Sequence, residues 1–303
     1  MNDNTKINPF RQRMIEDMSM RQFTKDTQSG YLLGIKRLSN FLGKSLDKTT
    51  KEDLRLFQLH LVDSGATSST INNTVSAIRF FFKVTLDRPD VVAKICHVPV
   101  PRRLPIVLTV EEVTRLMDVA NPKYKAAFAL AYGSGLRIGE VISLKISDID
   151  SKRMSIHIQQ GKGKKDRYGL LSEVLLEQLR DWWRYAKANN RIIKGGWLFP
   201  GQNPVNHMSE RQLARACTAA AKDANIEKHV TMHLLRHSFA THLLEQHVDI
   251  RVIQVLLGHA KLSTTAIYAQ VATNLLREVI SPIESLATKQ ARQPKKKRKQ
   301  LKE

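Results

Sequence analysis

The sequence is most informative between residues 231 and 268, where it reads Met232-His233-Leu234-Leu235-Arg236-His237, then Leu257-Gly258-His259, then Tyr268. Thr231 can act as an N-cap, so we expect a helix that begins after it and continues to about Gln246. On that helix His233 and Arg236 are three residues apart and share a face. The other side of the helix carries apolar residues that we expect to face the core: Leu235, Phe239 and Leu243.

A second apolar helix is expected from Ile250 to Leu257. It should end at Gly258, because glycine most easily adopts the left-handed conformation that terminates helices. His259 then lies just past the helix end, and Tyr268 follows nine residues later in a further helical segment. Taken alone, a packing tyrosine or a histidine on a solvated helix face is common. The joint spacing predicts that an arginine, two histidines and a tyrosine converge at one site.

This spacing resembles the C-terminal signature of the tyrosine recombinases, a family that includes phage integrases and the Xer proteins. The family has a further box upstream, and residues 134–140, Ser-Gly-Leu-Arg-Ile-Gly-Glu, resemble it. The resemblance implies that Arg137 holds the scissile phosphate and that Glu140 supports the site. A dinucleotide-binding glycine motif does not explain this segment, because its glycines follow a predicted helix and not a strand.

A basic β-hairpin is predicted between these two segments. Met154, Ile156 and Ile158 alternate with polar residues, as in a half-buried strand, and residues 168–171 form a second strand. The connecting tip, Gly-Lys-Gly-Lys-Lys-Asp-Arg, is not a Walker loop. A basic hairpin tip is most often only solvated. In the family that this chain resembles, however, a lysine of the hairpin enters the active site, and Lys162 matches that position.

Phosphodiester cleavage explains why these residue types are needed. Arg137 and Arg236 can neutralise the charge that grows on the phosphate, with a bidentate geometry that lysine lacks. A tyrosine hydroxyl, with a pKa of about 10, needs a proton acceptor, and His233 is the best-placed candidate. The resemblance assigns protonation of the 5′ oxygen to Lys162, and we expect His259 to hydrogen-bond a phosphate oxygen. We expect no metal and no cofactor, because no Asp/Glu cluster suggests a two-metal site.

The resemblance implies that Tyr268 attacks DNA to form a 3′-phosphotyrosine, which allows strands to be rejoined without ATP. We therefore predict a site-specific DNA recombinase or integrase for integration, excision or resolution of DNA elements. The alternatives are a type IB topoisomerase and a noncatalytic basic DNA-binding protein. Double-stranded DNA is the expected partner. We expect the protein to be a monomer without DNA and to assemble into a homo-tetramer across two paired DNA sites. The resemblance implies that protomers are joined through an apolar C-terminal stripe, formed by Leu276, Val279, Ile280, Ile283 and Leu286. The alternative is that this stripe folds back on its own domain.

The composition agrees with a polyanionic partner. The 303 residues include 49 Lys and Arg against 28 Asp and Glu, a net charge of +21. No apolar run approaches the roughly 18 residues of a membrane span, and the first residues contain no signal-peptide core. We therefore expect a cytoplasmic protein with no membrane partner. Cys96 and Cys217 lack the spacing of a metal site or a disulfide framework, and we interpret both as packing residues.

The predicted fold is mainly α with a small antiparallel β-sheet. Residues 1–98 are expected to form a helical core-type DNA-binding domain, which is SAM-like by the resemblance. Residues 99–107 contain three prolines and are interpreted as a linker. An α+β catalytic domain then spans residues 108–290, and a basic tail spans 291–303.

Capping residues are expected before most helices: Thr27, Thr50, Ser68 or Ser69, Thr109, Asn121, Ser172 and Ser209. Six basic residues outside the catalytic set are candidate DNA contacts: Arg102, Arg103, Lys164, Lys165, Arg211 and Arg215.

Overall fold

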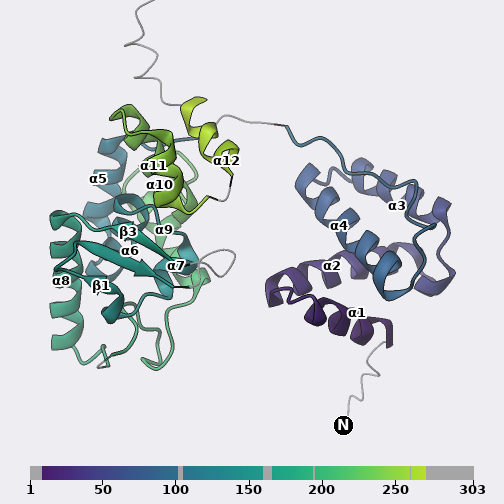
Figure 1. The fold of residues 1–303 in the computed structure, drawn as a ribbon, viewed down its shortest axis with the longest axis horizontal. Coiled ribbons are helices and arrows are strands. Elements are labelled where there is room, and N and C mark those ends of the chain that lie inside the picture. Colours follow the sequence, from purple (N-terminus) through teal and green to yellow (C-terminus); the bar gives the residue numbers. More distant parts are fainter. Residues whose placement is uncertain (1–8, 102–104, 160–165, 194, 260, 271–303) are drawn as a thin grey trace, which may run out of the picture. The chain divides into compact units, whose positions relative to one another are not determined.

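The computed structural model describes residues 9–101, 105–159, 166–193, 195–259 and 261–270 (Figure 1). The chain divides into two compact units, Met1–Arg102 and Arg103–Glu303. Among the described residues helices predominate, and the strands form one antiparallel sheet. The predicted fold class, mainly α with a small antiparallel sheet, is therefore confirmed.

The first unit is helical throughout its regular structure. Its elements are α1 (Pro9–Met20), α2 (Lys25–Leu42), the 3-10 helix η1 (Leu46–Lys48), α3 (Lys51–Asp63), α4 (Ser68–Phe80) and the π-helical turn η2 (Phe81–Thr85). Their apolar faces meet in one cluster, which includes Met14, Met18, Leu38, Leu54, Phe57, Val75 and Phe82. The helical character predicted for this part of the chain is confirmed.

Two of the predicted caps in this unit are wrong by a few residues. The N-cap of α2 is Thr24, whose Oγ1 accepts the backbone N–H of Thr27 at 3.3 Å. The N-cap of α4 is Thr67, one residue before the predicted serines. In both places several hydroxyl residues follow one another, and each could cap a helix. The cap is the one whose backbone is still extended, with ψ of 154° at Thr24 and 150° at Thr67.

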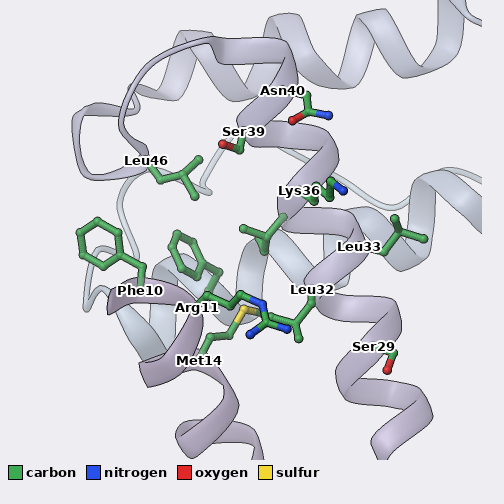
Figure 2. A pocket seen from close by; sticks show the side chains of 12 residues that line it. Phe10, Arg11, Met14, Ser29, Leu32, Leu33, Lys36, Ser39, Asn40 and Leu46 are labelled. Carbon is green, nitrogen blue, oxygen red and sulfur yellow. The ribbon is translucent and has the colours of Figure 1, made fainter. Parts of the chain in front are cut away.

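An open cavity of about 520 Å³ lies between α1 and α2 (Figure 2). Figure 2 shows Phe10, Arg11 and Met14 on α1 and side chains from Ser29 to Asn40 on α2, with Leu46 beside them. The cavity is lined by apolar side chains with a few polar ones. It belongs to the unit that contains none of the candidate catalytic residues, so it is not a candidate for the cleavage site.

The second unit combines helices with the sheet. Its elements are α5 (Val110–Val119), α6 (Pro122–Gly133), α7 (Ile138–Ile142), η3 (Ile146–Asp148), β1 (Ile149–Asp150), β2 (Ser155–Ile158), β3 (Arg167–Leu170), α8 (Glu173–Ala188), α9 (Glu210–Asp223), α10 (Met232–Glu245), α11 (Ile250–Leu257), α12 (Leu262–Ala266) and the 3-10 helix η4 (Ile267–Gln270). Helices α6 and α8 pack within one apolar core that includes Phe128, Leu130, Leu175 and Trp182.

The sheet has the order β1-β2-β3, and both pairs are antiparallel. In β2 the predicted alternation of apolar and polar side chains is present, because Ile156 and Ile158 are buried at the core face. In the β2–β3 register Ile156 is opposite Gly169, and Ile158 is opposite Arg167. Strand β1 is only two residues long and was not predicted. The tip of the hairpin lies outside the described residues.

Helix starts in this unit were predicted more accurately. Thr109 forms a capping box with Glu112, and each side chain accepts a hydrogen bond from the other's backbone N–H. Asn121, Ser172 and Ser209 accept hydrogen bonds as the N-caps of α6, α8 and α9. Over the described ranges, no helix is both long enough and apolar enough to span a membrane.

The two cysteines differ in their surroundings. Cys217 is fully buried, as a packing residue should be, and burial raises the pKa of its thiol to about 12. The interpretation of Cys96 as a packing residue is wrong, because Cys96 is exposed. The side chain of Gln58 holds this residue: the carbonyl of Cys96 accepts from Gln58 Nε2 at 2.8 Å, its backbone N–H donates to Gln58 Oε1 at 3.1 Å, and its sulfur lies 3.8 Å from the same Nε2.

Candidate active site

Helix α10 supplies the central arginine of the site. Thr231 caps the helix by accepting the N–H of Leu234, and the side chain of Arg236, one turn further on, is only 1% exposed. Arg236 Nη1 donates to the carbonyl of Gly135, and Nη2 donates to the carbonyl of Leu257 at 2.6 Å. Burial lowers the pKa of Arg236 to about 10, so the guanidinium keeps its charge at neutral pH.

A second arginine and a carboxylate come from the start of α7. Arg137 is the N-cap residue, and Glu140 is three residues later, so the helix places both side chains on one side. Arg137 Nη1 donates to Glu140 Oε1 at 2.8 Å. Arg236 Nη1 lies 3.8 Å from the other carboxylate oxygen. Glu140 is 8% exposed, so its charge is buried among arginines that compensate for it.

His259 is placed by the end of α11. Gly258 terminates that helix with φ of +61°, as predicted, and His259 follows it. The Nε2 of His259 is 3.1 Å from Arg236 Nη2, and its Nδ1 is 2.9 Å from the hydroxyl of Thr265, which is fully buried. Burial, with the positive charges of Arg236 and Arg137 adding to it, lowers the pKa of His259 to about 4.

Tyr268 lies in η4 and packs with its ring inside the site. It is 2% exposed, and its ring centroid is 5.1 Å from that of His237 and 6.3 Å from that of His259. Burial raises the pKa of Tyr268, while the charges of Arg236 and Arg137 act in the opposite direction. The candidate nucleophile is thus covered by protein in the DNA-free chain.

The two histidines of α10 lie in contact with each other. The ring centroids of His233 and His237 are 4.0 Å apart, and the ring of His237 also contacts Tyr268. Burial lowers the pKa of both, to about 4 for His237. The Nδ1 of His237 is buried and has no hydrogen-bond partner among the described residues.

The structure therefore brings together Arg137, Glu140, Arg236, His259 and Tyr268, with His233 linked to Tyr268 through the ring of His237. Arg211 and Arg215 lie elsewhere, on the exposed side of α9, where they line a hollow with Tyr124. Five candidates fall outside the described residues: Lys162, Lys164, Lys165, Arg102 and Arg103. In the part of the chain that the structure describes, no group of three His, Cys, Asp or Glu residues could hold a metal ion.

Three residues at the site were given no role from the sequence: Arg167, His237 and Thr265. His237 follows Arg236 directly in the sequence, so it was expected to lie near the site. The spacing did not indicate that its ring would contact His233 and Tyr268. Arg167 was counted with the basic hairpin tip, whereas its side chain is buried and its Nη2 donates to Glu140 at 2.6 Å. No sequence signal separated Arg167 from the tip, because its position opposite the buried Ile158 follows from the strand register of the folded chain.

Comparison with known proteins agrees with this arrangement. Residues 107–274 match the phage integrase family, and residues 10–90 match the phage integrase N-terminal SAM-like domain. The chain belongs to the phage integrase family of tyrosine recombinases, which confirms the resemblance stated from the sequence.

Two curated relatives show how much of the chain is shared. The chain is 42% identical over 283 residues to a putative integrase/recombinase of Sinorhizobium fredii, covering 92% of this chain and 90% of the relative. It is 35% identical over 253 residues to the tyrosine recombinase XerA of Pyrococcus horikoshii, covering 83% and 86%. Among solved structures, XerH bound to a palindromic difH substrate has a similar fold, with a TM-score of 0.69 at 22% identity over 94% of this chain and 91% of that one.

Proposed function

We propose that this chain is a site-specific DNA recombinase or integrase that cuts and rejoins DNA strands through a 3′-phosphotyrosine at Tyr268. The observation that carries the proposal is the pairing of Arg137 and Arg236 around Glu140, with the Tyr268 ring packed beside His259 and His237. Two guanidinium groups and a tyrosine within one site match the needs of phosphodiester attack.

Each side chain would have a distinct role. Arg137 and Arg236 would bind the nonbridging oxygens and stabilise the charge that develops on the phosphorane. His233, neutral because its pKa is lowered, would accept the proton of the tyrosine hydroxyl, and His259 would hydrogen-bond a phosphate oxygen. Lys162 would protonate the departing 5′ oxygen, a role that rests on the family resemblance. The reaction conserves the energy of the broken bond in the phosphotyrosine, so rejoining needs no ATP.

DNA binding would have to rearrange the end of the described chain. Tyr268 is 2% exposed and Arg236 is 1% exposed, so neither can contact a phosphate in the DNA-free arrangement. His259 contacts the guanidinium of Arg236, and Tyr268 lies in η4, on the segment that follows α11. We infer that η4 moves as DNA enters and uncovers the hydroxyl of Tyr268.

The proposed partners are duplex DNA and further copies of this chain. The net charge of +21 supports a polyanionic substrate, and the exposed Arg211 and Arg215 are proposed DNA contacts. A lambda integrase dimer bound to a core site has a similar fold, with a TM-score of 0.69. For this chain we propose a monomer alone and a tetramer across two paired sites, joined through the C-terminal apolar stripe. Because the substrate is DNA, we also propose that the protein acts in the cytoplasm.

The Tyr268→Phe substitution tests the function most directly. Wild-type protein should form a covalent complex with members of a library of random-sequence duplexes, and sequencing the captured DNA gives the site. The variant should bind that site with nearly unchanged affinity and form no covalent complex, because only the hydroxyl is removed. Trapping by Tyr268→Phe at the wild-type yield would overturn the assignment of the nucleophile.

The same library separates the alternatives. A noncatalytic DNA-binding protein would capture no DNA covalently. A type IB topoisomerase would relax a supercoiled plasmid without exchanging strands between two captured sites. Truncation after Ala272 should leave binding to one site intact and abolish strand exchange, if the C-terminal stripe joins protomers.

A further inference from the structure

Arg167 is a third arginine at the site, with its side chain largely covered, and none of the proposed catalytic steps uses it. It lies at the start of β3, and its side chain is only 12% exposed. Its Nη2 donates to Glu140 Oε2 at 2.6 Å, and its Nη1 donates to the carbonyl of Leu256 at 2.8 Å. Both outer nitrogens are therefore bound to protein groups that also shape the environment of the proposed catalytic arginines.

The end of α11 is held by three arginines from three different elements. The carbonyls of Leu256, Leu257 and Gly258 accept from Arg167, Arg236 and Arg137, at 2.8, 2.6 and 3.4 Å. The last carbonyls of a helix have no partners within the helix and carry its partial negative charge, so they favour cations. His259 is the next residue along the chain. Its position thus depends on all three arginine contacts.

Glu140 is fixed between Arg137 and Arg167. Its Oε1 accepts from Arg137 Nη1 at 2.8 Å, and its Oε2 accepts from Arg167 and from the backbone N–H of Arg137. Without Arg167, a buried carboxylate oxygen loses its shortest partner and gains freedom to attract the nearby guanidinium of Arg236, now 3.8 Å away. An arginine drawn toward Glu140 is turned away from the phosphate that it must bind.

The turn that carries His259 is also packed against Arg167. A Cβ on Gly258 would lie 2.7 Å from Arg167 Cδ and 2.8 Å from its Nε, so only a glycine allows the arginine stem to lie this close. This packing of the Arg167 stem on Gly258 is separate from the hydrogen bond that Arg167 donates to the carbonyl of Leu256. Arg167 therefore supports the His259 turn both by packing and by its charge.

We propose that Arg167 is a positioning residue for DNA cleavage: by bridging Glu140 and the end of α11, it orients Arg137 and Arg236 toward the scissile phosphate and fixes the turn that presents His259. The proposal rests on the proposed function. Direct phosphate contact, the role proposed for Arg236, is the competing role for Arg167, and separate measurements of cleavage and of affinity distinguish the two.

The test uses full-length protein and a nicked duplex that contains a site captured by the wild type, so that the covalent product accumulates in a single turnover. The variants are Arg167→Met, which keeps the length of the stem, and Arg167→Lys, which keeps the charge. Arg153→Met is the matched control, because Arg153 is exposed and pairs only loosely, at 3.9 Å, with Asp150. Cleavage at saturating DNA and the dissociation constant are measured separately.

Arg167→Met should lower the cleavage rate constant by about 10²-fold, the effect of a small misplacement of reacting groups, with little change in the dissociation constant. Arg167→Lys should recover only part of the rate, because an ammonium cannot bridge Glu140 and Leu256 as a guanidinium does. Arg153→Met should cleave at the wild-type rate. Unchanged cleavage by Arg167→Met would overturn the proposal, and a large loss of affinity with normal cleavage would indicate direct phosphate contact.

A second substrate separates positioning from a purely structural role. Replacing the scissile phosphate with a methylphosphonate removes the negative charge that the arginines must meet. If Arg167 acts by orienting them, the difference between wild type and Arg167→Met should largely disappear on this substrate. An equal loss on both substrates would show that the substitution only damages the fold and would overturn the proposal. Failure of the wild type to attach to any DNA would instead overturn the proposed function.

Discussion

His259 uses its two ring nitrogens for different purposes. A guanidinium can only donate, so Nε2 must accept from Arg236, and the ring proton must lie on Nδ1, next to the hydroxyl of Thr265. The lowered pKa of His259 agrees with such a neutral ring. Donation from Nε2 to a phosphate oxygen therefore requires the ring to change tautomer or to gain a proton. The protonation of the His259 ring is therefore one difference between the DNA-free arrangement and the proposed cleavage arrangement.

The histidines of the site should make the fold sensitive to mild acid. The pKa of His237 and that of His259 are lowered to about 4, whereas the unfolded chain binds these protons near pH 6.5. Between these values the unfolded state binds more protons, so the free energy of unfolding should fall as the pH is lowered from 6.5 toward 4. Urea unfolding at pH 7.0, 6.0 and 5.0 measures this, in a range where most carboxylates stay charged.

The double variant His237→Phe, His259→Gln provides the control for this prediction. It removes the two histidines whose pKa is lowered to about 4 and leaves His233, so its free energy of unfolding should depend less on pH over the same range. Equal pH dependence in the variant and the wild type would show that these two histidines do not cause the effect.

The loop between α6 and α7 depends on Gly135. Its φ is +63°, and a Cβ there would lie 2.6 Å from the ring of Phe239 and 2.8 Å from Leu257 Cδ2. We predict that Gly135→Ala lowers the free energy of unfolding by about 2 kcal/mol or more, combining left-handed strain with overpacking. It should also slow cleavage, because the carbonyl of Gly135 accepts from Arg236. Urea unfolding and single-turnover cleavage are the measurements.

Gly195→Ala is the matched control for the Gly135→Ala substitution. Gly195 also has a left-handed φ, of +72°, but nothing lies within 4 Å of its Cβ position. This variant should lose only about 1 kcal/mol from backbone strain and should cleave normally. If both substitutions lowered the free energy of unfolding by the same amount, the clash with Phe239 and Leu257 would not contribute to the loss of stability in Gly135→Ala.

Elements were easier to predict from the sequence than their contacts. Capping boxes and helix ends depend on neighbours in the chain, so Thr109 with Glu112, Thr231 and Gly258 were identified correctly. Where hydroxyl residues are adjacent, as at Thr24 and Thr27, several caps are locally equivalent and tertiary packing selects one. The bridge from Arg167 to Glu140 and Leu256 spans 27 and 89 residues of sequence, and no local pattern encodes it.

At the scale of the whole molecule, the net positive charge should dominate the affinity for DNA. Each phosphate neutralised by a Lys or Arg adds about 0.9 to the slope of log affinity against log salt concentration. Deleting residues 291–303, which are rich in Lys and Arg, should therefore reduce the slope measured by fluorescence anisotropy with a labelled duplex. Cleavage at saturating DNA should not change, because no proposed catalytic residue is removed. An unchanged slope would mean that the tail makes no phosphate contacts.

Every described residue of the proposed cleavage site comes from the second unit, and the buried cluster of the first unit shares no residue with those of the second. Substitutions that reshape the first unit therefore need not disturb the arginine–glutamate pairing or the tyrosine. Over evolutionary time, a lineage of such proteins could exchange or diversify its helical unit while inheriting the same chemistry.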